Sequence, residues 1–270
     1  MKSKICIIGC GWLGFPLAEF LIAKGFSING STSTEHKLKK LAIAGIQPFL
    51  LKFSPNNISG DLSNCLSDCK TLILNIPPGF RKNPNSDYLS MMSNLINPIE
   101  NSSVEQVLFI GSTSIYEDGL EIPIINENSK TSTSAIATKL LQVEELFQKN
   151  KNFVCTILRF SGLIGNQRHP AKYLSGKSGL KNPKAPVNLI DQKDCIQIIE
   201  TIITNNIWNN VFNASYPSHP EREEFYVNAC KTLKLPIPLF DHSKESKGKI
   251  ISSNKLVQQL NYRFKVEINN

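Results

Sequence analysis

One stretch near the start of the chain decides the fold: Lys4-Ile5-Cys6-Ile7-Ile8-Gly9-Cys10-Gly11-Trp12-Leu13-Gly14. The apolar run before Gly9 predicts a short buried strand. The residues after it repeat apolar side chains at helical spacing, which predicts a helix over Gly11–Lys24. A G-x-G-x-x-G between a strand and a helix is typical of a turn that binds a dinucleotide.

The three glycines have different expected tasks in such a turn. Gly9 permits the tight turn, Gly11 lets backbone amides approach a pyrophosphate, and Gly14 lets the helix pack closely on the strand. The amino end of the helix adds a partial positive charge that favours phosphate. We expect Trp12 and Leu13, which lie inside the turn, to contact the cofactor as well.

Strand and helix patterns alternate over the first 160 residues or so. The predicted strands are Lys4–Ile8, Phe26–Asn29, Ile46–Leu51, Thr71–Asn75, Gln106–Ile110 and Phe153–Phe160. The further predicted helices are Thr34–Ala44, begun by a capping box at Thr32 and Glu35, Asp87–Ile99 and Thr133–Lys149. This order predicts an α/β fold: a Rossmann doubly wound parallel sheet with helices on both faces.

The regular alternation ends near Gly165. The segment after it predicts helices over Asp194–Ile203, Glu221–Leu233 and Ser253–Leu260 and a strand over Val211–Ser215. We therefore expect a dinucleotide-binding domain over 1–165, its sheet completed by parts of 187–215. Residues 166–270 should form a small substrate-binding lobe that is not an independent domain.

Composition and charge exclude several classes of protein. The chain has 270 residues, with 41% hydrophobic and 19% charged residues, as in soluble globular proteins. Its apolar runs are shorter than the ~20 residues of a membrane-spanning helix. The net charge is +8, either from a lysine-rich coding bias or from a need to attract phosphates. Five basic residues and no acid lie within 167–184, which suits a phosphorylated small ligand better than nucleic acid.

The cysteines argue against metal and disulfides. There are 7 of them, with no C-x-x-C pair and only 4 histidines, so we expect no metal site. Free thiols in apolar runs behave as small hydrophobic side chains. The apolar run before Cys10 is too short for a secretory signal. A reducing cytoplasm is the expected compartment.

The segment after the second strand bears on the choice of cofactor. In NAD-selective sites an acid at this place binds the ribose 2′-hydroxyl. Here Gly30–Thr34 holds no carboxylate, and Ser31, Thr32, Ser33 and the nearby Lys37 would accept a 2′-phosphate. This favours NADP, with NAD as the alternative because no arginine is present. Thr32 and Ser33 could also serve only to cap the next helix.

Several further motifs resemble one enzyme family. They are Asn75-Ile76-Pro77-Pro78-Gly79, Gly111-Ser112-Thr113-Ser114-Ile115-Tyr116, Ile157–Gly165 and Val187–Asp194. With the strand order, they resemble the extended and atypical short-chain dehydrogenase/reductases, the NAD-dependent epimerase/dehydratase group, and within it a bacterial subgroup labelled nucleoside-diphosphate-sugar epimerase-like. The resemblance implies the following further cofactor contacts: Asn75, Ile76, Pro77, Pro78, Phe160, Gly162 and Leu163.

The same resemblance implies a catalytic Ser, Tyr and Lys. The Ser is Ser112 and the Lys is Lys139, but Ala135 stands four residues before Lys139, where the family has its Tyr. Three alternatives follow: Tyr116 substitutes, another group such as Asp191 or a water does, or the protein does not turn over. Each candidate also has a structural interpretation: Tyr116 as a loop residue, Ser112 as a turn hydroxyl and Lys139 as a solvated lysine.

The resemblance further implies the substrate contacts and the function. Ser114, Arg168, Asn188 and Asp191 would face a nucleotide-sugar, although the basic segment could simply be solvated. We expect an NAD(P)-dependent epimerase/dehydratase- or reductase-like enzyme, as a monomer or homodimer, with a small-molecule substrate and neither a nucleic-acid nor a membrane partner. The alternative is a dinucleotide-binding regulatory or sensor protein without redox turnover.

Overall fold

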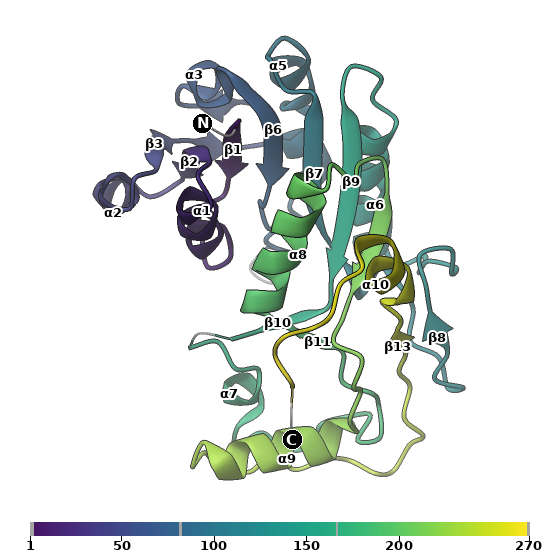
Figure 1. The fold of residues 1–270 in the computed structure, drawn as a ribbon. Helices are drawn as coiled ribbons and strands as arrows, with labels where there is room; N and C mark the ends of the chain where they lie inside the picture. The colour runs from purple at the N-terminus through teal and green to yellow at the C-terminus, as the bar shows by residue number, and fades with distance from the viewer. Residues whose placement is uncertain (1–2, 81–82, 166, 269–270) are drawn as a thin grey trace. The chain divides into compact units, whose positions relative to one another are not determined.

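A parallel sheet of seven strands forms the centre of the fold (Figure 1). The computed structural model describes residues 3–80, 83–165 and 167–268. In spatial order the strands are β3 (Gln47–Leu50), β2 (Ser27–Thr32), β1 (Lys4–Ile8), β6 (Cys69–Leu74), β7 (Gln106–Ser112), β9 (Val154–Phe160) and β12 (Val211–Ala214). The order reverses direction at β1, as in doubly wound sheets that bind dinucleotides, which confirms the predicted fold class.

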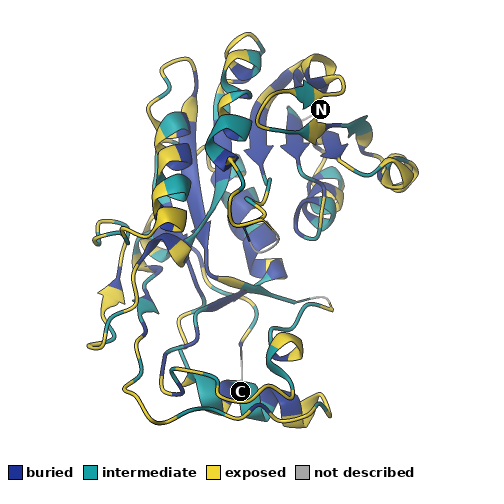
Figure 2. Cartoon of the chain, turned by 180° about the vertical axis from the view of Figure 1, so that it is seen from behind, coloured by how far each residue is buried: buried dark blue, intermediate teal, exposed yellow. Residues whose placement is uncertain are grey.

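The two faces of the sheet follow from the alternation of side chains along each strand. Cys6 and Ile8 of β1 and Cys69, Leu72 and Leu74 of β6 join one buried cluster with side chains of the helices α3 (Leu62–Leu66), α4 (Tyr88–Ser93), α5 (Ile96–Glu100) and α6 (Ala135–Gln148). On the other side, α1 (Gly14–Ala23) contacts β1 and β2. Figure 2 shows the inner strands of the central sheet mostly buried, while most of the longer helices carry both buried and exposed residues.

The chain divides into two compact units. The first comprises the described residues of 1–111, 133–158 and 199–211, and the second those of 112–132, 159–198 and 212–270. Besides its share of the sheet, the second unit has two small parallel pairs, β10 (Gly162–Ile164) with β11 (Leu189–Asp191) and β8 (Ile124–Ile125) with β13 (Ile250–Ile251). Its helices are α7 (Ala171–Leu174), α9 (Arg222–Thr232), α10 (Asn254–Leu260) and the first half of α8 (Gln192–Thr204).

A buried carboxylate anchors the C-terminal segment of the second unit. Asp194, fully buried in the first turn of α8, accepts hydrogen bonds from the Tyr262 hydroxyl at 2.7 Å, the Lys265 amide at 2.8 Å and the Val266 amide at 3.1 Å. Sequence analysis suggests no such role, because the partners lie about 70 residues further on.

Several predicted boundaries differ from the structure. The predicted helix over 87–99 is two helices, because Pro98 lacks an amide hydrogen and its ring excludes the carbonyl of Asn94. The predicted helix over 34–44 is a 3-10 turn, η1 (Glu35–Lys37), followed by α2 (Leu38–Ile43). The predicted capping box was wrong: Thr32 lies in β2 and its hydroxyl accepts from the Thr34 amide at 3.2 Å. Sequence analysis missed α3 and the hairpin of β4 (Lys52–Phe53) and β5 (Ile58–Ser59).

Candidate nucleotide-binding site

The turn between β1 and α1 is closed by contacts at Gly9. This residue has a φ of +104°, and a Cβ placed there would lie 2.4 Å from the carbonyl oxygen of Asn75. The Asn75 side chain donates to the Gly9 carbonyl at 2.9 Å, and the Gly9 amide donates to the Ser31 hydroxyl at 3.1 Å. No residue but glycine fits this position without strain.

The other two glycines differ in their surroundings. A Cβ at Gly14 would lie 2.2 Å from the Gly9 carbonyl oxygen, so helix and turn pack as closely as two backbones allow. A Cβ at Gly11 would meet no atom within 4 Å among the described residues. Gly11 is exposed, Trp12 is half-buried and Leu13 is buried. The structure thus leaves open space over the Gly11 backbone, where a pyrophosphate could lie.

The amino end of α1 is suited to bind an anion. In the described part of the chain, no side-chain hydrogen bond caps this end, and its first turn holds no acidic residue. Uncapped amides at a helix start carry partial positive charge and donate to phosphate oxygens. The arrangement therefore fits a dinucleotide: an open backbone at Gly11 and, three residues further on, a helix start.

The residues predicted to receive a 2′-phosphate fall into two groups. Ser31 and Thr32 are buried in β2, and their hydroxyls accept from backbone amides of the turn and of Thr34. Ser33 and Lys37, in contrast, are exposed. Only Ser33 and Lys37 keep exposed side chains that could contact a phosphate.

The segment that follows β6 lies beside the glycine turn. Asn75 joins it to Gly9, and the Tyr88 hydroxyl donates to the Ile76 carbonyl at 3.0 Å. Pro77 is exposed and Pro78 is half-buried. The structure thus places the predicted contacts Asn75 and Ile76 directly beside the glycine turn.

Ser112 and Ser114 form a hydroxyl pair in the second unit. Ser112 ends β7 and caps the 3-10 turn η2 (Thr113–Ile115), with its hydroxyl accepting from the Ser114 amide at 3.2 Å. It also donates to the Ser114 hydroxyl at 2.9 Å. Ser114 is exposed. The geometry therefore gives Ser112 a structural task, while leaving Ser114 open to solvent.

Tyr116 is a buried member of a polar network. Only 2% of it is exposed, and its hydroxyl accepts from Arg159 at 2.7 Å and donates to Asn213 at 3.0 Å. Burial raises the pKa of the Tyr116 phenol, although the Arg159 charge acts in the opposite direction. Both hydrogen-bonding directions of this hydroxyl are occupied. This geometry favours the structural interpretation of Tyr116 over the catalytic one.

Ala135 and Lys139 lie on α6 in the first unit. Ser134 caps this helix by accepting from the Ala137 amide at 3.3 Å, so Ala135 is its first residue, and it is exposed. Lys139 is half-buried, with its ammonium group 5.7 Å from the centre of the Phe80 ring. Residues four apart share a helix face, so a tyrosine at 135 would lie beside Lys139.

Asn188 and Asp191 have structural partners within the second unit. The side-chain nitrogen of Asn188 donates to the Lys249 carbonyl at 2.8 Å, and the side-chain oxygen of Asn188 accepts from the backbone amide of Ile251 at 2.8 Å. These two bonds hold β13 in place. The Asp191 carboxylate accepts from the Lys193 amide at 2.7 Å at the start of α8. A Cβ placed at Gly165 would lie 2.8 Å from the other carboxylate oxygen of Asp191, so Asp191 lies close to Gly165.

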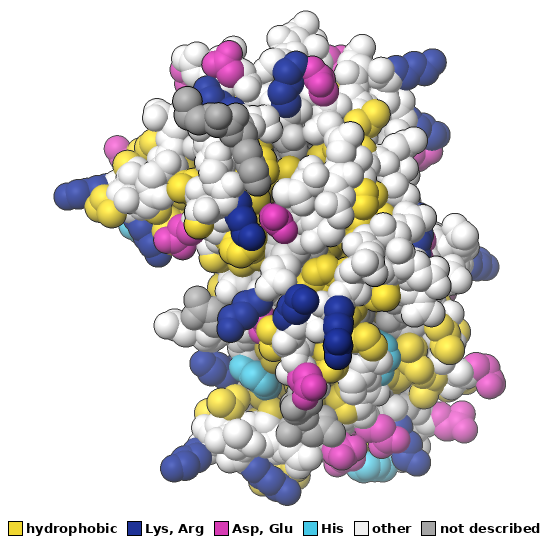
Figure 3. Space-filling view, viewed as in Figure 1, with side chains coloured by type: hydrophobic (Ala, Val, Ile, Leu, Met, Phe, Trp, Pro, Cys, Tyr) yellow, Lys and Arg dark blue, Asp and Glu magenta, His cyan; other side chains and the backbone are white. Residues whose placement is uncertain are grey.

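The remaining predicted contacts follow β9. Phe160 is buried, Leu163 is half-buried and Gly162 is exposed. Arg168 is half-buried and exchanges both backbone hydrogen bonds with Gly165. The four lysines of the basic segment, Lys172, Lys177, Lys181 and Lys184, are exposed. Figure 3 shows Lys and Arg scattered over the face in view, with Asp and Glu among them.

Sequence analysis missed two residues that hold the loop after β7. Arg159 is buried and bonded to Tyr116, and Lys249 donates to the Tyr116 carbonyl at 2.9 Å and to Asp118 at 2.7 Å. An arginine inside an apolar strand pattern is a signal for the first of these. No signal exists for Lys249, because 133 residues separate it from Tyr116.

Comparison with solved structures places this fold among those of known enzymes. A UDP-glucuronic acid 4-epimerase from Bacillus cereus, solved with UDP-glucuronic acid and NAD, aligns with a TM-score of 0.79 at 15% identity, covering 98% of this chain and 95% of that one. A conserved protein of unknown function from Silicibacter pomeroyi aligns with a TM-score of 0.78 at 17% identity, covering 98% and 94%. The chain therefore has the fold of the NAD-dependent epimerase/dehydratase group, as its motifs indicate.

A sequence relative identifies the family. The chain is 30% identical to Protein YeeZ of Escherichia coli (strain K12) over 268 residues, which cover 97% of this chain and 96% of that protein. The chain belongs to the YeeZ family. No protein-family model matches it. None of the helices in the described ranges is long and apolar enough to cross a membrane.

Proposed function

We propose that this protein binds a nicotinamide dinucleotide at the β1–α1 turn. The observation that carries the proposal is the contrast among the three glycines: Gly9 and Gly14 are enclosed by backbone, whereas Gly11 faces open space. A glycine that no neighbouring atom requires is explained by a ligand that approaches its backbone. Several solved structures with this fold hold NAD as a bound molecule, which supports the same proposal.

Residues of both the turn and the neighbouring strand would hold the dinucleotide. The backbone at Gly11 and the first amides of α1 would bind the pyrophosphate, with Trp12 and Leu13 beside it. Asn75, Ile76, Pro77 and Pro78, which follow β6 in the same unit, would border it. When bound, such a group supplies a nicotinamide ring that accepts or donates hydride.

We further propose a preference for NADP over NAD. Ser31 and Thr32 are committed to backbone amides, so the preference rests on Ser33, Lys37 and the absence of a carboxylate over residues 30–34. A carboxylate here would bind the NAD ribose and repel a 2′-phosphate. An exposed lysine and hydroxyl would attract that phosphate.

The proposed reaction is that of an epimerase/dehydratase- or reductase-like enzyme acting on a nucleotide-sugar or related metabolite. Solved structures with the same fold hold UDP-sugars. A bovine sterol-4-alpha-carboxylate 3-dehydrogenase is 25% identical over 179 residues, which cover 61% of this chain and 48% of that protein. The motif resemblance assigns Ser112 and Ser114 to a substrate oxygen, Lys139 to the nicotinamide ribose and Arg168 to a substrate phosphate.

A second candidate function is dinucleotide binding without redox turnover, as in a sensor or regulatory protein. Two observations favour it: Ala135 offers only a methyl group at the usual place of the acid/base, and the Tyr116 hydroxyl is buried with both bonding directions occupied. Loss of a positioned acid or base commonly lowers a rate by ~10²–10⁴.

Titration followed by a turnover assay separates the two functions. Binding of NADPH and NADH is measured by quenching of the intrinsic tryptophan fluorescence. Turnover is then measured with a set of nucleotide-sugars in two ways: by the near-ultraviolet absorbance of the reduced nicotinamide, which reports a net reductase, and by chromatography of the sugar products, which reports an epimerase or dehydratase that returns its hydride. The enzyme proposal expects binding and turnover with at least one member of the set. Binding without turnover by either measurement supports the second candidate, and a lack of binding contradicts both.

A further inference from the structure

A group of exposed apolar side chains lies in the second unit, where α7 contacts α9. Tyr173 is 62% exposed, Ile237 is 45% exposed and Leu239 is 63% exposed. The segments that carry these residues run side by side, because the Leu239 amide donates to the Lys177 carbonyl at 2.8 Å and the Leu180 amide donates to the Leu239 carbonyl at 3.1 Å. Exposed apolar side chains that gather in this way indicate a contact surface.

Lysines surround these apolar side chains. Residues 168–184 and 225–240 include no acidic residue. Figure 3 shows Lys and Arg side chains over α7 and one end of α9. The basic surface, as we define it, comprises Tyr173, Ile237, Leu239 and the exposed lysines Lys177, Lys181, Lys231 and Lys234. Within the described ranges, none of these four ammonium groups has a hydrogen-bond or ion-pair partner, so they would attract a partner of negative charge.

A second exposed surface of the same unit has the opposite charge. The loop of residues 117–127, which includes β8 and which we name the acidic loop, contains no lysine or arginine. Glu117 and Glu121 are exposed, and neither carboxylate has a partner among the residues that the structure describes. Leu120 is 53% exposed and Ile124 is 70% exposed. The acidic loop thus combines apolar and negatively charged side chains, as the basic surface combines apolar and positively charged ones.

The acidic loop is fixed to the second unit by backbone hydrogen bonds. Gly119 and Gly248 exchange two of them, each 2.9 Å long, and β8 pairs with β13. A segment that is already ordered loses little conformational entropy when it binds a partner. Figure 1 shows β8 and α7 at opposite sides of the second unit. The acidic loop therefore cannot reach the basic surface of its own chain.

We propose that the acidic loop of one copy of this chain docks on the basic surface of a second copy. The contact would bury the apolar side chains of both surfaces and would pair glutamates with lysines around them. Two basic surfaces, or two acidic loops, would instead repel each other. Because the two surfaces lie on opposite sides, the contact joins copies head to tail, which gives a ring or an open chain of copies.

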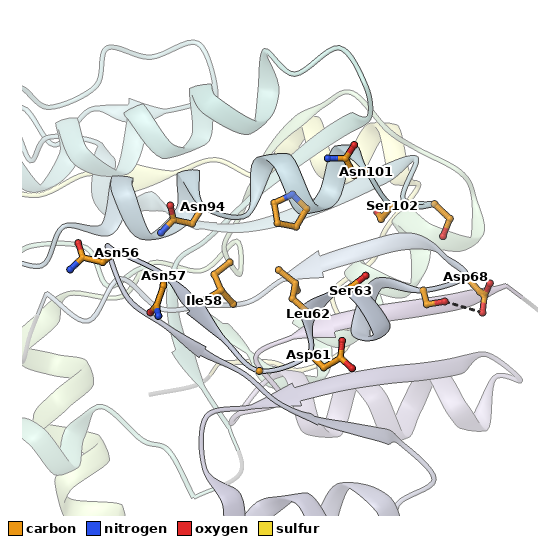
Figure 4. Close-up of a pocket in the computed structure, with 14 residues that line it drawn as sticks. Asn56, Asn57, Ile58, Asp61, Leu62, Ser63, Asp68, Asn94, Asn101 and Ser102 are labelled. Carbon is orange, nitrogen blue, oxygen red and sulfur yellow. Dashed lines mark hydrogen bonds between the residues drawn. The ribbon is translucent and has the colours of Figure 1, made fainter.

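The groove of the first unit is less suited to receive the acidic loop. It has a volume of about 800 Å³, and Figure 4 shows Asp61 and Asp68 among the polar side chains that line it. No lysine, arginine or histidine is among its described lining residues. The two aspartates would repel Glu117 and Glu121, so charge favours the basic surface over this groove.

Sedimentation velocity of the full chain at several concentrations and low ionic strength tests the proposal. We expect the average mass to rise with concentration beyond that of a dimer. In 1 M salt the association should weaken at least ~10-fold, because charges are screened within ~3 Å. The basic-surface variant, Lys177→Glu with Lys234→Glu, should stay monomeric, and so should the acidic-loop variant, Glu117→Lys with Glu121→Lys.

An equimolar mixture of these two variants is the decisive sample. Each variant should be monomeric alone, but the mixture should associate, because the unchanged acidic loop of the first fits the unchanged basic surface of the second. The matched control is Lys39→Glu with Lys151→Glu, which changes the net charge equally at exposed lysines of the first unit. It should associate as the wild type does. Circular dichroism checks that every variant is folded.

The apolar part of the contact has its own test. Leu239→Ser should weaken the association at least ~10-fold. Ile43→Ser, at a side chain that is 78% exposed in the first unit, should leave it unchanged. The proposal is overturned if the wild type stays monomeric, if it forms a dimer that neither double variant weakens, or if the mixture of folded variants stays monomeric. A monomeric wild type that sediments with phosphatidylglycerol vesicles would make a membrane the occupant of the basic surface instead.

Discussion

Gly11 has no side chain, which leaves the space over the backbone of the turn open. Gly11→Asp would place a carboxylate in that space and next to the pyrophosphate. We expect NADPH affinity to fall at least ~10-fold, about 1.4 kcal/mol, because like charges repel there. The measurement is a fluorescence titration of the folded variant.

The matched control for this substitution is Ser63→Asp. It adds the same charge to an exposed residue of the same unit, on α3. Its affinity should equal that of the wild type. If Gly11→Asp folds and binds NADPH as tightly as this control does, the turn is not the binding site.

Tyr116 has a predicted effect on stability but not on binding. Tyr116→Phe removes the acceptor for Arg159 and the donor to Asn213, and leaves both buried groups short of a partner. We expect the free energy of unfolding in urea to fall by ~1–3 kcal/mol. The control Tyr173→Phe, at a tyrosine that is 62% exposed, should change little. Turnover abolished with stability unchanged would instead make Tyr116 the acid/base.

At the scale of elements, α6 is a scaffold that could accept the missing tyrosine. Ala135→Tyr costs only ~0.5 kcal/mol of helix propensity. Because Lys139 lies one turn further on the same face, its ammonium group should favour the phenolate. We predict that ultraviolet titration of this variant shows a tyrosine pKa below the ordinary ~10.

Removing the lysine charge tests that explanation. In Ala135→Tyr combined with Lys139→Met, the pKa of the new tyrosine should return toward its ordinary value. If the pKa in the single variant is already ordinary, Lys139 does not lie beside residue 135, and the assignment of the catalytic set fails.

The elements were predictable where the pattern is local. The β1–α1 motif and the alternation of strands and helices indicate the fold, because each depends on neighbours within a few residues. The extension of β2 to Thr32 was not predictable, because it depends on pairing with β3, where Thr32 lies opposite Leu50. That extension buries Ser31 and Thr32 and changes their part in the site.

The same limit applies to the site. The tasks of Gly9, Gly11 and Gly14 follow from the motif, but the contact of Gly9 with Asn75 spans 66 residues. The hydrogen bond from Tyr116 to Asn213 spans 97 residues. Sequence spacing carries no signal for such pairs, so Tyr116 could be interpreted as catalytic or as structural until its partners were known.

At the scale of the whole molecule, buried thiols link stability to alkaline pH. Burial raises the pKa of Cys10 to about 12, whereas an unfolded cysteine titrates near ~8.5. The Cys10 pKa is higher in the folded protein than in the unfolded one. The contribution of the protonated Cys10 thiol to the free energy of unfolding is therefore complete below pH ~8.5, and it is lost as pH rises toward 12. The loss amounts to ~1.4 kcal/mol per pH unit for each such thiol.

We therefore predict that the free energy of unfolding declines above pH ~9, measured by urea titration at several pH values. The free energy of unfolding of Cys10→Ala should decline less steeply with pH, because its unfolding releases about one proton fewer. This holds even if the variant is less stable at neutral pH. Equal slopes for wild type and variant would show that the Cys10 thiol ionises as readily in the folded protein as in the unfolded one.

The central claim is that a nicotinamide dinucleotide binds over Gly11, and a crystal structure of the full chain soaked with NADP(H) tests it. The account predicts density for the pyrophosphate against the Gly11 backbone and the amino end of α1. It predicts the 2′-phosphate near Ser33 and Lys37. Dinucleotide bound elsewhere on the chain, or no binding at concentrations that saturate NADP-dependent enzymes, would contradict the account.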